Sequence, residues 1–224
     1  MQNKSYYILL FIISLIAGFI LLGFFVSANP VPAFDLNISL FVQKYHSDVL
    51  DKIMLGISLL GELPYSLIMV VLVALLFFYL KYKRESYFIF SILLSGLIIL
   101  GVKNIIDRPR PTEFYVRLVE INRFQSFPSG HVMSYILFFG FMIVLMRRLK
   151  AIPILTRRII TYISVFFMLT VAFSRVYLGA HWFSDTVGGL LLGLVCLFLL
   201  SYFYIKPFKK ESEIKPKSYP RYLN

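Results

Sequence analysis

Residues 6–26, YYILLFIISLIAGFILLGFFV, decide the fold, because they run for 21 residues without a charged side chain. An α-helix of about 20 apolar residues crosses the hydrocarbon core of a bilayer. A signal peptide is the alternative, since Val26-Ser27-Ala28 is similar to a cleavage site. The apolar run is longer than the usual signal-peptide core, which favours a retained membrane helix.

Five further uncharged stretches follow along the chain. Together with the first, they predict an all-α, polytopic membrane protein with six transmembrane helices. Three of the five are slightly short for a full crossing, so the polar residues beside them should lie at the edge of the apolar slab. The five stretches are residues 63–80, 86–102, 132–146, 159–174 and 186–205.

The composition agrees with a membrane protein. Apolar residues make up 59% of the 224, charged residues only 15%, and the mean hydropathy is +0.79. Soluble domains have about 45–50% apolar and about 25% charged residues. The single cysteine, Cys196, excludes an intramolecular disulfide framework and a Cys-based zinc site. We expect one membrane domain over residues 1–205 and a flexible, basic cytoplasmic tail over residues 206–224.

The net charge of +12 could indicate a nucleic-acid partner, but it is better explained by membrane topology. With the N-terminus inside, fifteen Lys and Arg residues fall on the inner side of the six stretches and eight on the outer side. Basic residues collect in cytoplasmic loops. We therefore expect a plasma-membrane protein with both termini in the cytoplasm, no nucleic-acid partner, and an oligomeric state that the sequence does not define.

Between the first two stretches, apolar residues recur at three- and four-residue steps over residues 34–54. This spacing predicts an amphipathic helix at the outer membrane interface, with a simple connecting loop as the alternative. The apolar positions are Phe34, Ile38, Phe41, Val42, Tyr45, Val49 and Ile53.

Polar residues gather where the third stretch ends, the fourth begins, the fifth ends and the sixth begins. In an up-and-down helical chain these four points lie on one side of the membrane, here the outer side. Each residue alone could be an ordinary interfacial side chain, but together they indicate a site. They are Lys103, Arg110, His131, Arg175, His181 and Asp185.

The chemistry of this cluster suits a phosphoryl group, whose transfer spreads charge over three oxygens and needs several fixed donors. Lys103, Arg110 and Arg175 supply positive charge. Ser129 and Gly130 precede a helix and could add backbone N–H groups. Arg108 is an additional cation that could contact a second phosphate.

The histidines supply a nucleophile and an acid. His181 and Asp185 are four residues apart, so on a helix Asp185 can orient the imidazole and leave the other ring nitrogen free to attack. His131 can protonate the leaving group. The two histidines could exchange these roles, although the pairing with Asp185 favours His181 as nucleophile. Asp185 is the only carboxylate tied to these helices, so we expect no metal and no other cofactor.

These residues resemble the three-part signature of the type 2 phosphatidic acid phosphatase (PAP2) family of membrane lipid phosphatases. The first part is Lys103 followed after six residues by Arg110-Pro111. The second is Pro128-Ser129-Gly130-His131, and the third is Ser174-Arg175 followed by His181 and Asp185.

The resemblance implies hydrolysis of a lipid phosphomonoester or diphosphate through a phosphohistidine on His181, at the outer face and without metal. It also implies that His131 is the general acid and base and that Asp185 orients His181. Lys103, Arg110, Ser129, Gly130 and Arg175 would hold the phosphate.

Other functions remain open at this point. A serine hydrolase could use Ser129, His181 and Asp185, and a non-catalytic lipid binder or transporter could use the cations alone. Among lipid substrates, undecaprenyl diphosphate and phosphatidylglycerophosphate are favoured by the resemblance, and phosphatidic acid is possible.

Overall fold

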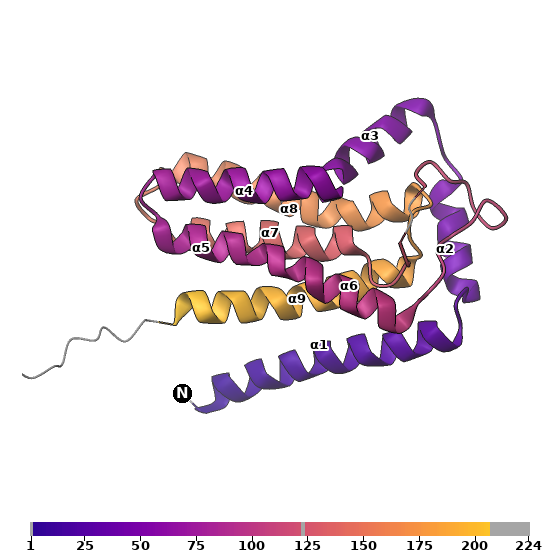
Figure 1. Ribbon diagram of the computed structural model, residues 1–224, viewed down its shortest axis with the longest axis horizontal. Helices are drawn as coiled ribbons and strands as arrows, with labels where there is room; N and C mark the ends of the chain where they lie inside the picture. The colour runs from indigo at the N-terminus through magenta and orange to yellow at the C-terminus, as the bar shows by residue number, and fades with distance from the viewer. Residues whose placement is uncertain (1, 122–123, 207–224) are drawn as a thin grey trace, which may run out of the picture.

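The computed structural model describes residues 2–121 and 124–206, and every regular element in these ranges is helical (Figure 1). This confirms the all-α prediction. The helices are α1 (Gln2–Ala28), α2 (Ala33–Gln43), α3 (Asp48–Ser58), α4 (Leu63–Tyr79), α5 (Lys83–Ser91), α6 (Ser95–Ile106), α7 (Gly130–Arg148), α8 (Ile154–Tyr177) and α9 (Phe183–Ile205). Two short 3-10 turns, η1 (Leu59–Gly61) and η2 (Ile92–Leu94), join α3 to α4 and α5 to α6.

All six apolar stretches lie on helices, as predicted. Five helical segments of the described chain are individually long and apolar enough to cross a membrane. They are Tyr6–Ala28, Lys83–Ile106, Gly130–Arg148, Ile154–Tyr177 and Phe183–Ile205. The remaining stretch forms α4, which passes the same test only together with the preceding segment, from which it is bent by 56°.

Helix α7 lies at the centre and is buried over most of its length, packed against α8 and α9. Small residues on α9 allow this close packing. A Cβ atom added at Gly189 would lie 2.5 Å from the carbonyl oxygen of Ser129, and one at Gly193 would lie 3.0 Å from Cβ of Ile136. Close backbone approach at small residues is the usual packing mode of membrane helices. The other helices expose apolar side chains on the outside of the bundle.

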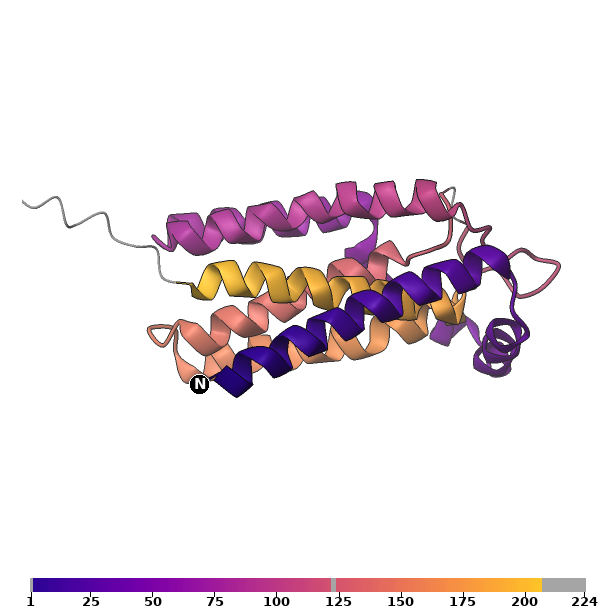
Figure 2. The ribbon, with the colours of Figure 1, turned by 90° about the horizontal axis from the view of Figure 1, so that it is seen from below.

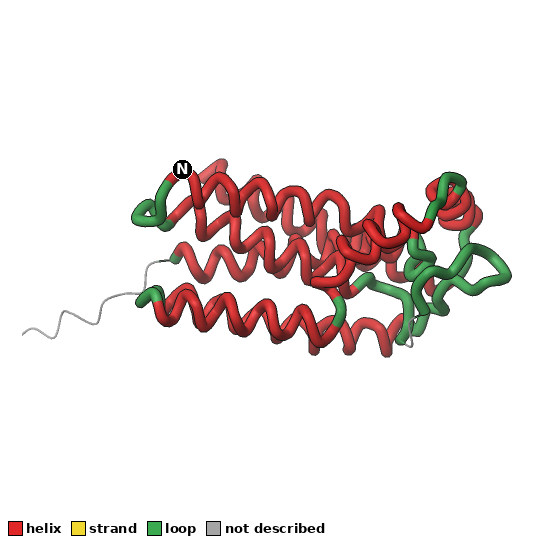
Figure 3. The backbone as a smooth tube through the Cα atoms, turned by 90° about the horizontal axis from the view of Figure 1, so that it is seen from above, coloured by secondary structure: helices red, strands yellow, loops and turns green. Residues whose placement is uncertain are grey.

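The two ends of the bundle differ. Helix α1 begins and α9 ends at one end, and α1 crosses the face of α9 (Figures 1 and 2). The other end carries α2, which runs across the bundle, and the long loop between α6 and α7 (Figure 3). The junctions that the sequence predicted to lie on one side therefore meet at this second end.

The amphipathic segment differs from the prediction, since residues 34–54 form two helices separated by a break at residues 44–47. After the break, α3 begins at Asp48 because Ser47 caps it, its hydroxyl accepting from the N–H of Leu50 at 3.2 Å. Helix α2 exposes Leu40 and Phe41 and turns its polar face toward the protein. That buried face consists of Asp35, Ser39 and Gln43.

The end of the chain is described only in part. Lys206 follows the last residue of α9. The predicted flexible basic tail, apart from this residue, lies outside the described residues.

Candidate active site

A cavity of about 700 Å³ opens between α4, α6 and the start of α7. Its size falls in the usual range for ligand sites. One part is polar and is lined by Lys103, Arg110, Gly130, His131 and His181. The rest is apolar. Leucine side chains that line it are also exposed on the outside of the bundle, so the apolar part continues to the surface that faces lipid: Leu63, Leu67, Leu97 and Leu100.

His181 lies in the short loop between α8 and α9, and its ring is buried. Its Nε2 atom is 3.3 Å from Nη1 of Arg110, beside the cavity. Its Nδ1 atom is 3.4 Å from Oδ2 of Asp185 on the other side, although these two atoms are not aligned as a hydrogen bond. Burial and the surrounding cations, Arg110 and Arg175 first, hold the pKa of His181 well below its usual 6.5. The imidazole is therefore neutral at pH 7, with its Nε2 side toward the cavity.

The backbone of this loop depends on one glycine. Gly179 has a φ of +70°, which favours glycine, and an added Cβ would lie 2.3 Å from the carbonyl oxygen of Arg117. The loop can therefore turn tightly against the α6–α7 loop. This turn brings His181 back over the N-terminus of α9.

Asp185 lies in the first turn of α9 and is fully buried. Its Oδ2 atom accepts from the N–H of Trp182 at 2.8 Å and from the hydroxyl of Ser126. Its Oδ1 atom accepts from Nη1 of Arg108 at 2.6 Å. The carboxylate thus caps α9 and is held from three directions, which fixes its position against His181.

Arg108 has a different place from the one expected of it. Its side chain is fully buried, and its guanidinium donates to Asp35 at 2.7 Å, to the hydroxyl of Ser184 at 2.7 Å, and to Asp185. Its Nε atom donates to the carbonyl of Pro30 at 2.9 Å. All three guanidinium nitrogens of Arg108 donate hydrogen bonds within the protein, so Arg108 is not available to bind a second phosphate.

The three cations predicted to hold phosphate all lie near the histidines. Lys103 donates to the carbonyl oxygens of Gln125 and Ser126. Arg110 donates to the carbonyl of Ala180 at 2.6 Å. Burial and the neighbouring Arg175 lower the pKa of Arg110 to about 10, so it still carries its charge at pH 7.

Arg175 is buried at the end of α8 and is bound by a carboxylate that the sequence did not point to. Its two terminal nitrogens donate to the two oxygens of Glu120 at 2.8 and 2.7 Å, and one of them also donates to the hydroxyl of Ser58. Its Nε atom is buried without a hydrogen-bond partner among the described residues. A bidentate carboxylate occupies the nitrogens that a phosphate would use.

His131 lies in the first turn of α7, and a second unpredicted carboxylate lies beside it. Oε1 of Glu62 is 3.1 Å from Nε2 of His131, although the two atoms are not aligned as a hydrogen bond. Glu62 also lies 3.9 Å from Arg175. Glu62 directly precedes the apolar stretch 63–80, and this position is the one signal in the sequence that could have identified it; Glu120 lies in the middle of the loop between two stretches and has no such signal.

Ser129 and Gly130 lie at the entry to α7. The backbone N–H of Ser129 donates to the carbonyl of Asp185 at 2.9 Å, so it is not free for phosphate as the sequence suggested. The hydroxyl of Ser129 is buried without a partner among the described residues. Gly130 lines the cavity.

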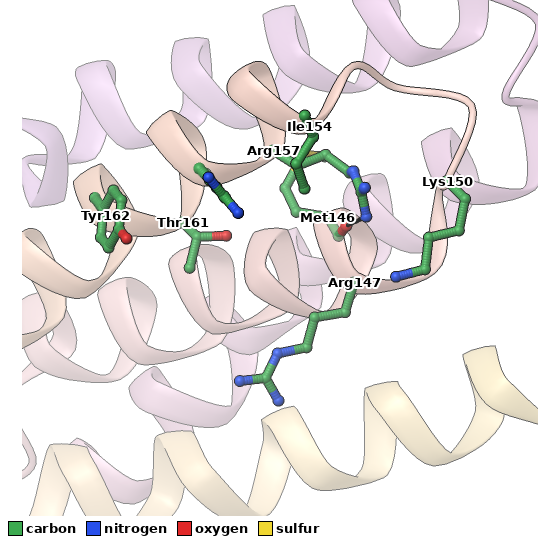
Figure 4. A pocket seen from close by; sticks show the side chains of 8 residues that line it. Met146, Arg147, Lys150, Ile154, Arg157, Thr161 and Tyr162 are labelled. Carbon is green, nitrogen blue, oxygen red and sulfur yellow. Dashed lines mark hydrogen bonds between the residues drawn. The ribbon is translucent and has the colours of Figure 1, made fainter.

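A cavity of about 210 Å³ lies at the opposite end of the bundle, where α7 ends and α8 begins (Figure 4). It is lined by basic and apolar side chains, with no histidine or carboxylate. Its lining is Met146, Arg147, Lys150, Ile154, Arg157, Arg158, Thr161 and Tyr162. This cavity therefore carries cations without a nucleophile or an acid, and the catalytic candidates belong to the larger one.

An all-helical, multi-pass membrane protein with two histidines and two cations lining one cavity, and a third cation near the histidines, fits the class of membrane lipid phosphatases. A family model described as PAP2 superfamily matches residues 84–209, more than half of the chain, and the chain belongs to this family. The predicted family is thus confirmed.

Relatives agree with this assignment. Phosphatidylglycerophosphatase B of Bacillus subtilis is 30% identical over 204 residues, which cover 89% of this chain and 98% of that protein. A crystal structure of a transmembrane PAP2-type phosphatidylglycerolphosphate phosphatase from Bacillus subtilis matches with a TM-score of 0.77 and 26% identity, covering 89% of this chain and 98% of that one.

Two further matches cover less of the chain. Lipid A 1-phosphatase of Rhizobium johnstonii is 30% identical over 115 residues, which cover 48% of this chain and 43% of that protein. LpxE of Aquifex aeolicus matches with a TM-score of 0.60 and 20% identity, covering 77% of this chain and 97% of that one.

Proposed function

We propose that this chain hydrolyses a phosphomonoester or diphosphate on a lipid headgroup through a phosphohistidine on His181. The observation that carries the proposal is the placement of the His181 ring between Asp185 and the cavity. Nδ1 lies 3.4 Å from the carboxylate, and Nε2 lies beside the cavity and Arg110. A carboxylate on one ring nitrogen orients the ring and stabilises the charge that develops when the other nitrogen attacks.

The reaction has two steps. Nε2 of His181 attacks phosphorus while the bond to the leaving oxygen breaks, and His131 gives that oxygen a proton. His131 then takes a proton from water as the water attacks the phosphohistidine, which releases inorganic phosphate and restores both histidines. Asp185 stabilises the imidazolium character of His181 in both steps.

The phosphate would be held by Lys103, Arg110 and Arg175, together with the Ser129 hydroxyl and Gly130. Glu120 would have to leave Arg175 when phosphate binds, since both anions use the same nitrogens. The unpartnered Ser129 hydroxyl and the unpartnered Nε of Arg175 support this role, because buried polar atoms normally have partners.

The substrate is a lipid in this proposal because the apolar part of the cavity meets leucines exposed on the outside of the bundle. The favoured substrates are phosphatidylglycerophosphate and undecaprenyl diphosphate, with phosphatidic acid as a third candidate. The similarity to phosphatidylglycerophosphatase B supports the first of these.

We also propose that the site faces the outside of the plasma membrane and that both termini are cytoplasmic. The support is electrostatic. The basic residues of the small cavity lie at the end of the bundle opposite the histidines, and they are part of the excess of Lys and Arg expected on the cytoplasmic side.

Catalysis without metal is part of the proposal. Within the described residues, no three His, Cys, Asp or Glu side chains are grouped so that they could hold a metal ion. Of the carboxylates near the histidines, Asp185 is bound to Arg108 and Glu120 to Arg175, and Glu62 lies 3.9 Å from Arg175.

The decisive experiment compares phosphate release by the purified protein and by His181→Ala. His46→Ala is the matched control, since His46 is the third histidine, is exposed, and lies outside the cavity. A panel of phosphatidylglycerophosphate, undecaprenyl diphosphate and phosphatidic acid ranks the substrates. The proposal requires loss of activity in His181→Ala and not in His46→Ala. Unchanged release by His181→Ala would overturn it.

A further inference from the structure

The buried carboxylate of Asp35 belongs to α2, far from the three motifs in sequence, and yet it lies beside the catalytic candidates. Its Oδ2 atom is 2.7 Å from Nη2 of Arg108, and neither side chain is exposed. Arg108 in turn lies 2.6 Å from Asp185, which is 3.4 Å from His181. These four side chains form a continuous chain from α2 to the imidazole, in which Arg108 lies between the two carboxylates of Asp35 and Asp185.

We propose that Asp35 is a positioning residue for His181 that acts through Arg108 and Asp185. The inference rests on the proposed function, since it assumes that His181 is the nucleophile. Nothing in the motifs points to Asp35, which lies outside all three of them in the segment of residues 34–54.

Geometry supports the role in two ways. First, Asp35 also accepts from the backbone N–H of Ser184 at 2.8 Å and from its hydroxyl. Ser184 precedes Asp185 in the first turn of α9, so Asp35 fixes the backbone that carries the catalytic carboxylate. Second, Asp35 and Asp185 bind Arg108 from two sides. The guanidinium therefore stays between the two carboxylates instead of pairing with Asp185 alone.

The charges of these side chains determine whether a variant stabilises or destabilises an imidazolium at His181. Asp35, Arg108 and Asp185 carry a net charge of minus one, buried next to His181. Neutralising Asp35 leaves the Arg108–Asp185 pair with no net charge, so an imidazolium at His181 loses electrostatic support. Neutralising Arg108 has the opposite sign, because Asp185 then acts on His181 without a cation beside it.

Other charged groups face His181 and remain in every variant. They belong to the α6–α7 loop and to α6, α7, α8 and α9, and they set the background on which Asp35 acts. They are Arg110, Lys103, His131, Arg175 and Asp185.

The test compares Asp35→Asn with Ser39→Ala in the full-length protein. Ser39 is one turn further along α2, is equally buried, and its hydroxyl has no partner among the described residues. We expect Asp35→Asn to lower kcat about tenfold and to move the acid limb of the kcat/KM profile down by about one pH unit, as for one pKa unit of lost stabilisation. KM should change less than twofold, because Asp35 does not touch the phosphate site.

Arg108→Gln is the second variant and tests the sign. A positioning role predicts that its acid limb moves up in pH, whereas a purely structural role moves neither limb. The proposal would be overturned if Asp35→Asn and Ser39→Ala had the same kcat and the same acid limb in their kcat/KM profiles. It would also be overturned if both Asp35→Asn and Arg108→Gln failed to fold while Ser39→Ala folds, since the network would then serve the fold.

His181→Ala separates this inference from the proposed function. If His181→Ala keeps its activity, the phosphohistidine mechanism is wrong and Asp35 has no nucleophile to position. If His181→Ala is inactive and Asp35→Asn behaves like Ser39→Ala, only the inference about Asp35 is wrong.

Discussion

Replacing Gly61 by alanine should displace His131 with little change elsewhere. Gly61 ends η1, immediately before α4, and faces the His131 ring. An added Cβ would lie 2.2 Å from Cδ2 of the ring and 2.7 Å from Cγ. The ring therefore has to move, because carbon atoms at these distances overlap.

The size of the effect follows from these distances. An ordinary contact begins at 3.4 Å, so the ring must move by about 1 Å. A misplacement of about 1 Å in a catalytic group costs about 100-fold in rate. That loss corresponds to about 2.7 kcal/mol of activation free energy.

The assay is the initial rate of phosphate release from phosphatidylglycerophosphate in mixed micelles, with the thermal midpoint measured in parallel. Gly56→Ala is the control, because an added Cβ there meets no atom within 4 Å. It should keep full activity. We expect Gly61→Ala to lose kcat about 100-fold at an unchanged thermal midpoint. If Gly61→Ala keeps more than half of the wild-type kcat, then His131 is not the acid or is not held where the structure places it.

Four further outcomes are expected. Gly188→Ala would put a Cβ 2.4 Å from the ring of Phe127, which directly precedes the second motif. This overlap should destabilise the protein by about 1–3 kcal/mol. An unchanged thermal midpoint would contradict this expectation. Since the pKa of His181 is held below 6.5, its imidazole stays neutral as the pH falls through 6.5, and the acid limb of kcat/KM should lie below that value. A limb at or above 6.5 would contradict a neutral, buried nucleophile. Glu120→Gln should weaken the ion pair with Arg175 that phosphate has to displace, and should therefore lower KM several-fold. A higher KM would show instead that Glu120 helps to bind substrate. EDTA should leave phosphate release unchanged, and loss of activity that magnesium restores would refute metal-independent catalysis.

The sequence predicts the helices well because their signal is local. Uncharged runs of 15 to 21 residues identify the spans, and residues 132–146 fall within Gly130–Arg148 of the structure. The convergence of the motifs is also predictable, since topology alone brings helix ends to one side. The structure accordingly places Lys103, Arg110, His131 and His181 around one cavity.

The partners of these residues are not predictable in the same way. Asp35 lies outside the three motifs, and Glu120 lies in the loop between two apolar stretches, so neither stands out in the sequence. Their ion pairs with Arg108 and Arg175 join positions far apart in the chain, and no local pattern encodes such contacts. The break at residues 44–47 was missed for a related reason: apolar periodicity continues across it while the Ser47 cap restarts the helix.

The leucine-lined side of the large cavity has a consequence for kinetics. A cavity of about 700 Å³ can enclose a headgroup and the first part of a chain, while the rest of a long lipid stays in the leaflet. Substrate then arrives, and product departs, by diffusion in two dimensions. The rate should follow the mole fraction of substrate in the surface rather than its bulk concentration, and diluting it with inert lipid should slow the enzyme even when the total amount is constant.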